Sequence, residues 1–474
     1  MPPILLVNPN LMKPPVTPVG LDHIGQHLRD AGFETELLDL AFAPSPEDAI
    51  DAAMRRDWLL VAVSVRNVDD SFGASRDFCL AHTKSLLDRI QSHTDAPVVI
   101  GGVGFSIFAR AAMTFCDVPY AIAGEGEQPL LRLVQCLRDG REPDGDISGL
   151  LVRRDGQIVT ANLPCRHDLR GMPAWRRDVV DNPRYLAEGG QVGFETKRGC
   201  PKPCTYCADP VAKGRRTIVR TPEHVADELD ALLAQGVDVF HTCDAEFNVP
   251  YDHALAVCDA LAARHLGDRI RWYAYVTPEH FDDRLAEAMR RAGCVGVDFT
   301  ADHADAAMLA RLGRSHTAAD LRRTAAACHR HGLAFMFDLL LGAPGDTREG
   351  IATTLDLMRQ LDVPRVGTSL GVRLYPGTPL VAWLADQRPL ADTPGISGIK
   401  GNAHLLRPVY FVEPSLDDDI DDHIRTLIAG DDRFLFPSGD ESAENYNYND
   451  NSVLTAAIRE GARGAFWDIL RRLA

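Results

Sequence analysis

The feature that most constrains the fold of this chain is an alternation of short apolar runs with helix-length amphipathic segments, in two separate blocks. In the first block, residues 1–140, the apolar runs expected to form strands are 4–10, 34–40, 58–67, 97–106 and 120–127. Strand–helix alternation with short turns is typical of a parallel, doubly wound sheet. Such sheets bind ligands at the carboxyl ends of their strands, so we expect a ligand site there.

The second block begins at residue 191 and predicts six strand–helix units. Its expected strands are 192–197, 237–244, 270–276, 294–300, 333–342 and 366–375. Six parallel units predict a partial (β/α)6 barrel over residues 191–380, with its active site at the C-terminal ends of the strands. Residues 141–190 lose the periodicity and are expected to form a linker. Residues 381–474 are expected to close over the substrate.

Length and charge narrow the class of protein. The 474 residues exceed what one hydrophobic core supports, so we expect more than one domain. The chain has 67 Asp and Glu against 50 Lys and Arg and no Lys/Arg block, so nucleic acid is not expected as a main partner. No apolar stretch approaches the ~20 residues that span a bilayer. The N-terminus lacks the features of a signal peptide, so we expect a cytoplasmic protein.

Three of the eleven cysteines form a cluster, whereas the other eight stand singly and are expected to be small buried side chains. The segment KRGCPKPCTYCAD places Cys200, Cys204 and Cys207 in a C-x3-C-x2-C spacing directly after an expected strand. Thiolates are the ligands of iron–sulfur clusters, and three of them leave one iron of a 4Fe–4S cube free for a substrate. The alternative is a structural zinc site, which usually pairs two separated cysteine dyads. The chain has no second C-x-x-C.

The cysteine spacing, Tyr206 before the third cysteine, and the position after the first barrel strand resemble the radical SAM superfamily. The resemblance implies that the free iron binds S-adenosylmethionine (SAM) and that the cluster cleaves it reductively to a 5′-deoxyadenosyl radical. It implies that SAM contacts Tyr206, Asp244, Glu246, Arg314, Gly342 and Pro344. Glu246 would accept hydrogen bonds from the amine, with Asp244 as helper, and Arg314 would hold the carboxylate. The alternatives are a helix-capping carboxylate for Glu246 and a solvated helix-end arginine for Arg314.

The first block resembles the cobalamin-binding domain that one large radical SAM subclass carries in front of its barrel. The resemblance implies that cobalamin contacts residues at the expected strand ends, namely Asn10, Ser64, Arg66, Asn67, Gly101, Gly102, Val103, Gly104, Phe105, Ser106, Gly124, Glu125 and Gly126. The Asp-x-His-x-x-Gly segment whose histidine ligates cobalt in other cobalamin domains is missing, and His23 reads as an ordinary helix residue. Cobalamin is therefore expected to be base-off and His-off. Its lower axial position would be open, filled by water, or blocked by a side chain such as Arg66 or Phe105.

Together the two resemblances imply a cobalamin-dependent radical SAM enzyme. We expect a C-methyltransferase that acts on an unactivated carbon of a small natural-product substrate, through methylcobalamin and a 5′-deoxyadenosyl radical. Two alternatives stay open: an enzyme with both cofactors that catalyses cyclisation, ring contraction or oxidation, and a non-catalytic metal or cobalamin sensor. An external electron donor such as flavodoxin or ferredoxin and a monomeric state are also expected. Tyr446 and Tyr448 are candidates for substrate contacts, although a solvated polar loop is the alternative there.

Overall fold

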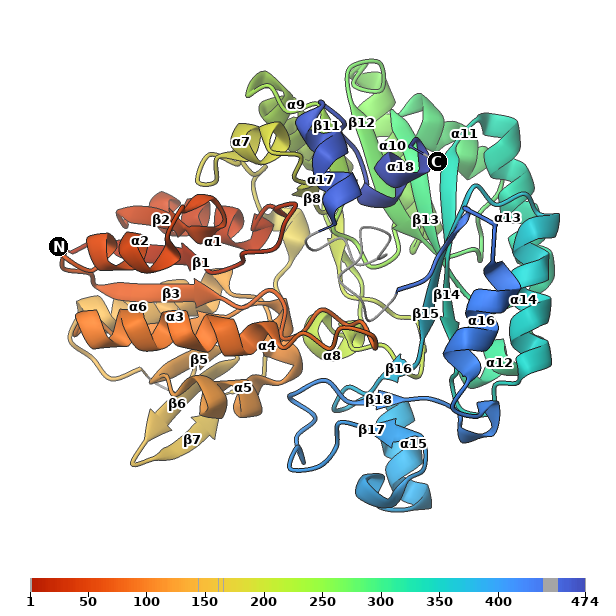
Figure 1. Cartoon of the computed structure of the whole chain (residues 1–474). Coiled ribbons are helices and arrows are strands. Elements are labelled where there is room, and N and C mark those ends of the chain that lie inside the picture. The colour runs from red at the N-terminus through yellow and green to blue at the C-terminus, as the bar shows by residue number, and fades with distance from the viewer. Residues whose placement is uncertain (1, 144, 161, 165, 438–450, 474) are drawn as a thin grey trace.

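The chain forms two large sheet-based halves, with the N-terminal half at the left and the C-terminal half at the right of Figure 1. The computed structural model describes residues 2–143, 145–160, 162–164, 166–437 and 451–473. The expected substrate contacts Tyr446 and Tyr448 lie outside the described residues.

The N-terminal half is a seven-stranded sheet in the order β2-β1-β3-β4-β5-β6-β7. Its parallel strands are β1 (Ile4–Asn8), β2 (Thr35–Asp39), β3 (Leu60–Ser64), β4 (Val98–Gly101) and β5 (Tyr120–Ile122), one in each apolar run of the first block. The helices are α1 (Val19–Asp30), α2 (Pro46–Ala53), α3 (Cys79–His93), α4 (Val103–Ile107), α5 (Ala109–Cys116) and α6 (Glu127–Arg138). Separate apolar cores on the two faces of the sheet make it the doubly wound sheet that the sequence predicts.

Part of the segment expected as a linker belongs to this sheet. β6 (Leu150–Arg154) and β7 (Gln157–Thr160) add an antiparallel hairpin to its β5 edge. These strands are short and half-exposed, which explains why their apolar pattern is weak.

The second half is an open, parallel barrel sheet in the order β19-β15-β14-β13-β12-β11-β8. Its strands are β8 (Val192–Phe194), β11 (Val239–Thr242), β12 (Arg271–Val276), β13 (Cys294–Asp302), β14 (Ala334–Leu341), β15 (Arg365–Leu370) and β19 (Phe434–Leu435). The accompanying helices are α9 (Pro222–Ala234), α10 (Tyr251–Ala263), α11 (Asp283–Arg291), α12 (Ala306–Arg311), α13 (Ala318–His331), α14 (Arg348–Gln360) and α16 (Ile420–Ile428). Because the sheet does not close on itself, the barrel is partial, as predicted.

Smaller elements surround the two halves. They are α7 (Asn182–Ala187), a hairpin of β9 (Lys197–Arg198) and β10 (Ile218–Val219), α8 (Asp209–Lys213), α15 (Pro379–Gln387), and a small sheet of β16 (Val372–Arg373), β17 (Ile396–Ser397) and β18 (Tyr410–Phe411). The C-terminal segment, expected as one helix, forms α17 (Ser452–Arg459) and α18 (Phe466–Arg471). Gly461 and Gly464 divide it, because glycine is a poor helix former.

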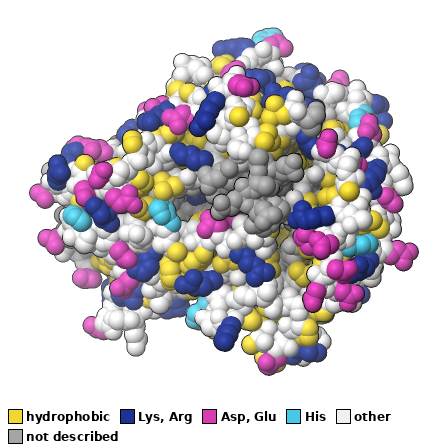
Figure 2. Space-filling model, in the orientation of Figure 1, with side chains coloured by type: hydrophobic (Ala, Val, Ile, Leu, Met, Phe, Trp, Pro, Cys, Tyr) yellow, Lys and Arg dark blue, Asp and Glu magenta, His cyan; other side chains and the backbone are white. Residues whose placement is uncertain are grey.

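The surface carries charges of both signs. On the face shown in Figure 2, Lys and Arg side chains are interspersed with Asp and Glu side chains. None of the described helices combines the length and apolarity that crossing a bilayer requires.

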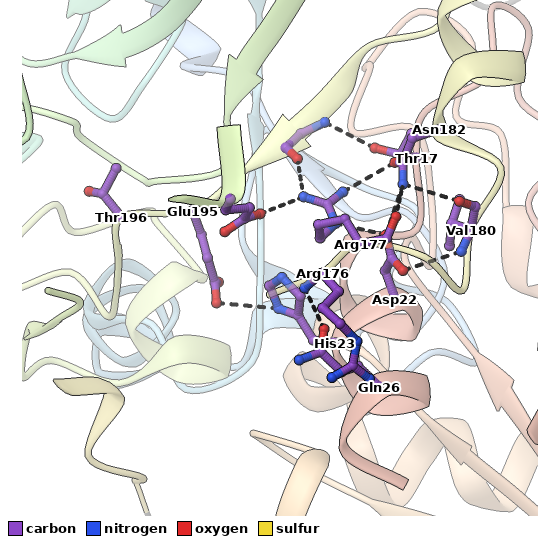
Figure 3. A network of polar contacts seen from close by, with 12 residues as sticks. Thr17, Asp22, His23, Gln26, Arg176, Arg177, Val180, Asn182, Glu195 and Thr196 are labelled. Carbon is purple, nitrogen blue, oxygen red and sulfur yellow. Dashed lines mark hydrogen bonds and ion pairs between the residues drawn. The ribbon is translucent and has the colours of Figure 1, made fainter. Parts of the chain in front are cut away.

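One buried arginine joins the two halves (Figure 3). The side chain of Arg177 is fully buried, and its Nε donates to Asp22 Oδ2 of α1 over 2.7 Å. Its Nη1 donates to Glu228 Oε1 of α9 over 2.6 Å and to the carbonyl of Gly193 in β8 over 2.8 Å. Asn182 donates a further hydrogen bond to Asp22. One guanidinium therefore binds a helix of the N-terminal half and a helix and strand of the barrel.

The Arg177→Met variant should lose about 3–5 kcal/mol of free energy of unfolding, since it leaves the buried carboxylate of Asp22 without a cation among the described residues, although Glu228 keeps its ion pair with Arg220. The neighbouring Arg176→Met variant is the matched control. Arg176 is half-exposed in its ion pairs with Asp30 and Asp178, and such pairs contribute only about 0–1 kcal/mol. Denaturant unfolding followed by tryptophan fluorescence measures both. Equal losses in the two variants would contradict the role assigned to Arg177.

Candidate functional site

A cavity of about 570 Å³ lies between the two halves. Its walls are the carboxyl ends of β1, β3 and β4 on one side and of β8, β11 and β12 on the other. Parallel sheets bind ligands at the carboxyl ends of their strands, and these ends of both sheets border the same cavity.

Nine of the residues expected to contact cobalamin line this cavity: Ser64, Arg66, Gly101, Gly102, Val103, Ser106, Gly124, Glu125 and Gly126. Ser106 joins the loop that contains Gly102 to the loop that contains Gly124. Its Oγ donates to the carbonyl of Gly102 over 2.7 Å and accepts from the amide of Gly124 over 2.9 Å. Gly102 has a φ of 111°, and a Cβ there would lie 2.6 Å from the carbonyl oxygen of Val65. Only glycine fits this turn, which brings bare backbone to the cavity.

Four other expected cobalamin residues lie outside the cavity lining. Phe105 is fully buried in the apolar core on the other face of the sheet, and Gly104 packs against the backbone of Arg66. Asn67 accepts a hydrogen bond from Arg66, and Asn10 accepts one from the amide of Met12. The run after β4 looks like one glycine loop in the sequence, but residues 103–107 form the helix α4, which turns its side chains in different directions.

The cavity continues into an apolar slot between the sheet and the helices α1 and α6. We call this part the inner slot, lined by Leu6, Leu21, Ile24, Ala62, Val99, Ile122 and Leu130. Its shape and apolar lining fit a flat aromatic base, such as the nucleotide base of a base-off cobalamin. The sequence gives no separate signal for these residues, because they have the apolar periodicity of ordinary core positions.

His23, at the wall of this slot, is held by packing. Its ring stacks on Trp175 with 4.2 Å between centroids, and its Nδ1 lies 3.5 Å from Glu195 Oε1. Burial and three nearby arginines hold the pKa of His23 well below its ordinary value, so the ring is neutral. His23 lies within α1, as the sequence predicts.

The three clustered cysteines lie in the segment that connects β9 to β10, and Gly199 and Asp209 on either side of them line the cavity. The amide of Cys200 donates to the carbonyl of Gly214 over 3.0 Å, and the amide of Thr205 donates to that of Leu312 over 2.9 Å. Gly199 has a φ of 86°, and a Cβ there would lie 2.2 Å from the carbonyl oxygen of Arg216. The hairpin therefore fixes the start of the loop through a position that only glycine can occupy.

The donor set of this loop is three thiols, the ligand type of iron–sulfur clusters. Among the described residues, no three His, Cys, Asp or Glu side chains converge as ligands of one metal ion. The irons of a cube stand at separate corners, so its thiolates are spread around it. Burial raises the pKa of Cys200, Cys204 and Cys207, so metal binding must displace their protons.

Arg314 links the cysteine loop to the barrel wall. Its Nη1 lies 3.0 Å from Cys204 Sγ, its Nη2 donates to Thr300 Oγ1 over 2.7 Å, and its Nε lies 3.1 Å from Asp302 Oδ2. Tyr206 donates to the same Asp302 oxygen over 2.7 Å. Arg314 is therefore not a solvated helix-end arginine: its side chain is 4% exposed and bound on three sides.

The two acidic residues expected at the SAM amine differ in their hydrogen bonding. Asp244 is saturated, because it accepts from the amide and hydroxyl of Thr196 and lies 3.4 Å from Lys197 Nζ. Glu246 accepts from Thr300 Oγ1 over 2.8 Å through Oε1, whereas its buried Oε2 has no partner in the described chain. Glu246 thus keeps a free acceptor for a ligand amine, and Asp244 positions the end of β8.

Gly342 and Pro344 lie in the turn after β14. The amide of Gly342 donates to Asp346 Oδ2 over 2.8 Å, and Arg311 donates to the carbonyl of Pro344 over 3.2 Å. Asp346 also lies 3.3 Å from Nε2 of the buried His303. These contacts fix the shape of the turn.

Two family models match the chain. The model described as the radical SAM superfamily matches residues 194–358, and the model described as the B12 binding domain matches residues 12–134. The two matches fall on the barrel and on the N-terminal sheet, respectively.

Individual relatives match along nearly the whole chain. A tryptophan 2-C-methyltransferase from Streptomyces laurentii is 30% identical, with 98% of this chain and 95% of that protein covered. The structure of the radical SAM methyltransferase TsrM from Kitasatospora setae with tryptophan and a SAM analogue superposes with a TM-score of 0.92, at 30% identity, over 100% of this chain and 98% of that one. TsrM was also solved with cobalamin and a [4Fe–4S] cluster. The cobalamin-dependent enzyme OxsB, at 16% identity and a TM-score of 0.71, covers 87% of this chain and 64% of its own, and shares the fold.

The Ala62→Leu variant should weaken cobalamin binding by about tenfold or more, because the longer side chain would fill the inner slot. Iron content after reconstitution should stay unchanged, since the cysteine loop is on the other half. Ala81→Leu, at an exposed position of α3, is the control. Visible absorbance of the cobalamin that stays bound after gel filtration measures the effect. Full cobalamin retention by Ala62→Leu would show that the slot does not hold the base.

Proposed function

The chain belongs to the cobalamin-dependent radical SAM methyltransferases, and we propose that it methylates a carbon of tryptophan or of a closely similar aromatic amino acid. The observation that carries this proposal is the near-complete alignment, in sequence and in structure, with enzymes whose named substrate is tryptophan. An alignment over both halves is informative because the cavity is built from both.

The cofactors are a 4Fe–4S cluster, SAM and cobalamin. Cobalamin would carry the methyl group to the substrate, and the cluster would bind SAM. We assign the cluster to Cys200, Cys204 and Cys207, and the SAM amine to the free oxygen of Glu246. Arg314 then acts as a positioning residue, since it holds Cys204 and Thr300 in place on either side of it.

We propose that Arg66 would contact cobalamin. It lines the cavity at the end of β3, and its hydrogen bond within the described chain goes to Asn67. A guanidinium has only N–H donors and no lone pair to give to a metal. Arg66 would therefore contact the cofactor without ligating cobalt. Phe105, the other side chain considered for the lower axial position, lies in the core.

We further propose that the protein acts as a monomer and receives electrons from an external donor such as flavodoxin or ferredoxin. The cysteine loop supports this proposal because it lies just below the surface. Pro201 and Pro203 are exposed, and the neighbouring Cys200 and Cys204 are buried. The donor would thus approach the cluster from this side of the barrel.

Anaerobically reconstituted protein should convert tryptophan to a product heavier by one methyl group. With methyl-deuterated SAM, the label should appear in the product by mass spectrometry. An unchanged mass or an oxidised or cyclised product would overturn the proposal. The radical route stays a prediction of the sequence, and the same assay tests it: 5′-deoxyadenosine should form in step with product, and methylated product without it would rule the route out.

The Cys204→Ala variant should lose bound iron and form no methylated product, because the loop then offers the cube only two thiolates. Cys79→Ala, at the start of α3 in the N-terminal half, should keep both its bound iron and its product formation. Iron analysis and mass spectrometry provide the two readouts. If Cys204→Ala retains wild-type product formation, the assignment of the cluster to this loop fails.

A further inference from the structure

The groups assigned to the cluster and to SAM come from three loops of the barrel. Cys200, Cys204 and Cys207 lie between β9 and β10, Glu246 follows β11, and Arg314 follows α12. Strand pairing fixes the ends of the strands but not the loops beyond them. A displacement of about 1 Å in such a site can cost on the order of 100-fold in rate. We therefore expect contacts that hold the three loops in one arrangement.

Glu279, in the loop between β12 and α11, contacts all three of these loops. Its carboxylate forms an ion pair with Lys202 of the cysteine loop. Its Oε2 accepts a hydrogen bond over 2.6 Å from Oγ of Ser315, in the loop after α12. Its carbonyl accepts one over 3.0 Å from Nδ2 of Asn248, in the loop after β11. Lys202 Nζ also donates to Ser315 Oγ over 3.4 Å, so the side chains of Lys202, Glu279 and Ser315 form a closed ring of contacts.

The buried Asn248 fixes the backbone that carries Glu279. Asn248 is 1% exposed, and its side-chain amide donates to the carbonyls of Thr277 over 2.9 Å and of Glu279 over 3.0 Å. Its Oδ1 accepts from the amide of Thr277 over 3.1 Å. Both N–H groups and the oxygen of the side chain are thus used. Because Asn248 is two residues after Glu246, these bonds tie the position of Glu279 to that of Glu246.

The ion pair of Lys202 and Glu279 is largely shielded from water, yet it lies outside the apolar core. The two side chains are 14% and 22% exposed, and both line an open groove beside the cysteine loop. The other basic residue of the described chain in ion-pair contact with Glu279 is His280, which is 68% exposed. A substitution at Lys202 or Glu279 should therefore displace loops and leave the core of the barrel intact.

We propose that Glu279 is a positioning residue for SAM, through its ion pair with Lys202 and its hydrogen bond with Ser315. This inference rests on the proposed function, because it takes the cysteine loop to hold the cluster whose free iron binds SAM. Lys202 would set the place of the cysteine loop, and Ser315 that of the neighbouring Arg314. Without Glu279 the three thiols would still hold a cluster, but its free iron would be displaced relative to Glu246, and SAM would bind more weakly.

The test measures the dissociation constant for SAM of the anaerobically reconstituted protein, by equilibrium dialysis with radiolabelled SAM. Glu279→Ala and Lys202→Met should each raise it about tenfold, the loss expected when a charge-assisted hydrogen bond is removed. The iron content of both should equal that of the wild type. Because both changes remove the same contact, the double variant should bind SAM about as weakly as either single variant. Glu287→Ala, at an exposed position of α11, is the matched control.

An exchange of the two charges separates positioning from general support of the loop. Lys202→Glu alone places two carboxylates side by side, whereas Lys202→Glu combined with Glu279→Lys restores an ion pair. The combined variant should therefore bind SAM more tightly than Lys202→Glu. Electron paramagnetic resonance of the reduced cluster gives a second readout. Added SAM should change the spectrum of the wild type, and Glu279→Ala should need about tenfold more SAM for the same change.

Unchanged SAM binding in the iron-loaded Glu279→Ala and Lys202→Met variants would overturn the inference. Losses that add up in the double variant, or a charge exchange that binds SAM no better than Lys202→Glu, would overturn it as well. Loss of iron from the single variants would show that the pair supports the loop as a whole, which also contradicts a role in placing SAM. If the wild-type protein binds neither cluster nor SAM, the proposed function itself fails, so the two failures are distinguishable.

Discussion

The site depends on one buried charge, the guanidinium of Arg177. It is bound at the same time by Asp22 of the N-terminal half and by Glu228 of the barrel, with the carbonyl of Gly193 as a third acceptor. Removing this cation would leave the buried Asp22 without a counter-charge among the described residues, which is far costlier than losing an exposed ion pair, whereas Glu228 would keep its ion pair with Arg220. The contact ties α1 of the N-terminal half to α9 and β8 of the barrel. The cavity lies between the strand ends of these two halves.

The N-terminal sheet and the barrel contribute different kinds of chemical groups to the site. The N-terminal sheet offers bare glycine backbone and an apolar slot, which suit a large flat cofactor with an apolar base. The barrel offers thiols and a carboxylate oxygen on Glu246 that has no partner among the described residues. The arginine that could neutralise this carboxylate, Arg314, is already held by Asp302.

The sequence predicts the two sheets and the cysteine loop well, because strand periodicity and cysteine spacing are local signals. It also points to Glu246 as the main acceptor of a ligand amine, with Asp244 as helper. The fold adds that Thr196 and Lys197 saturate Asp244, whereas one buried oxygen of Glu246 has no partner in the described chain. Phe105 was misplaced because α4 turns it into the core. The inner slot leaves no local pattern, because its members come from several strands and two helices.

The most direct test of this account is a crystal structure of the reconstituted protein with anomalous data collected at the cobalt and iron absorption edges. The account predicts a cobalt peak in the cavity between Arg66 and Tyr275, and iron peaks within the loop of Cys200, Cys204 and Cys207. The electron density for the cobalamin base should fill the slot beside Ala62. A cobalt peak outside the cavity, or cobalt ligated by His23, would contradict it.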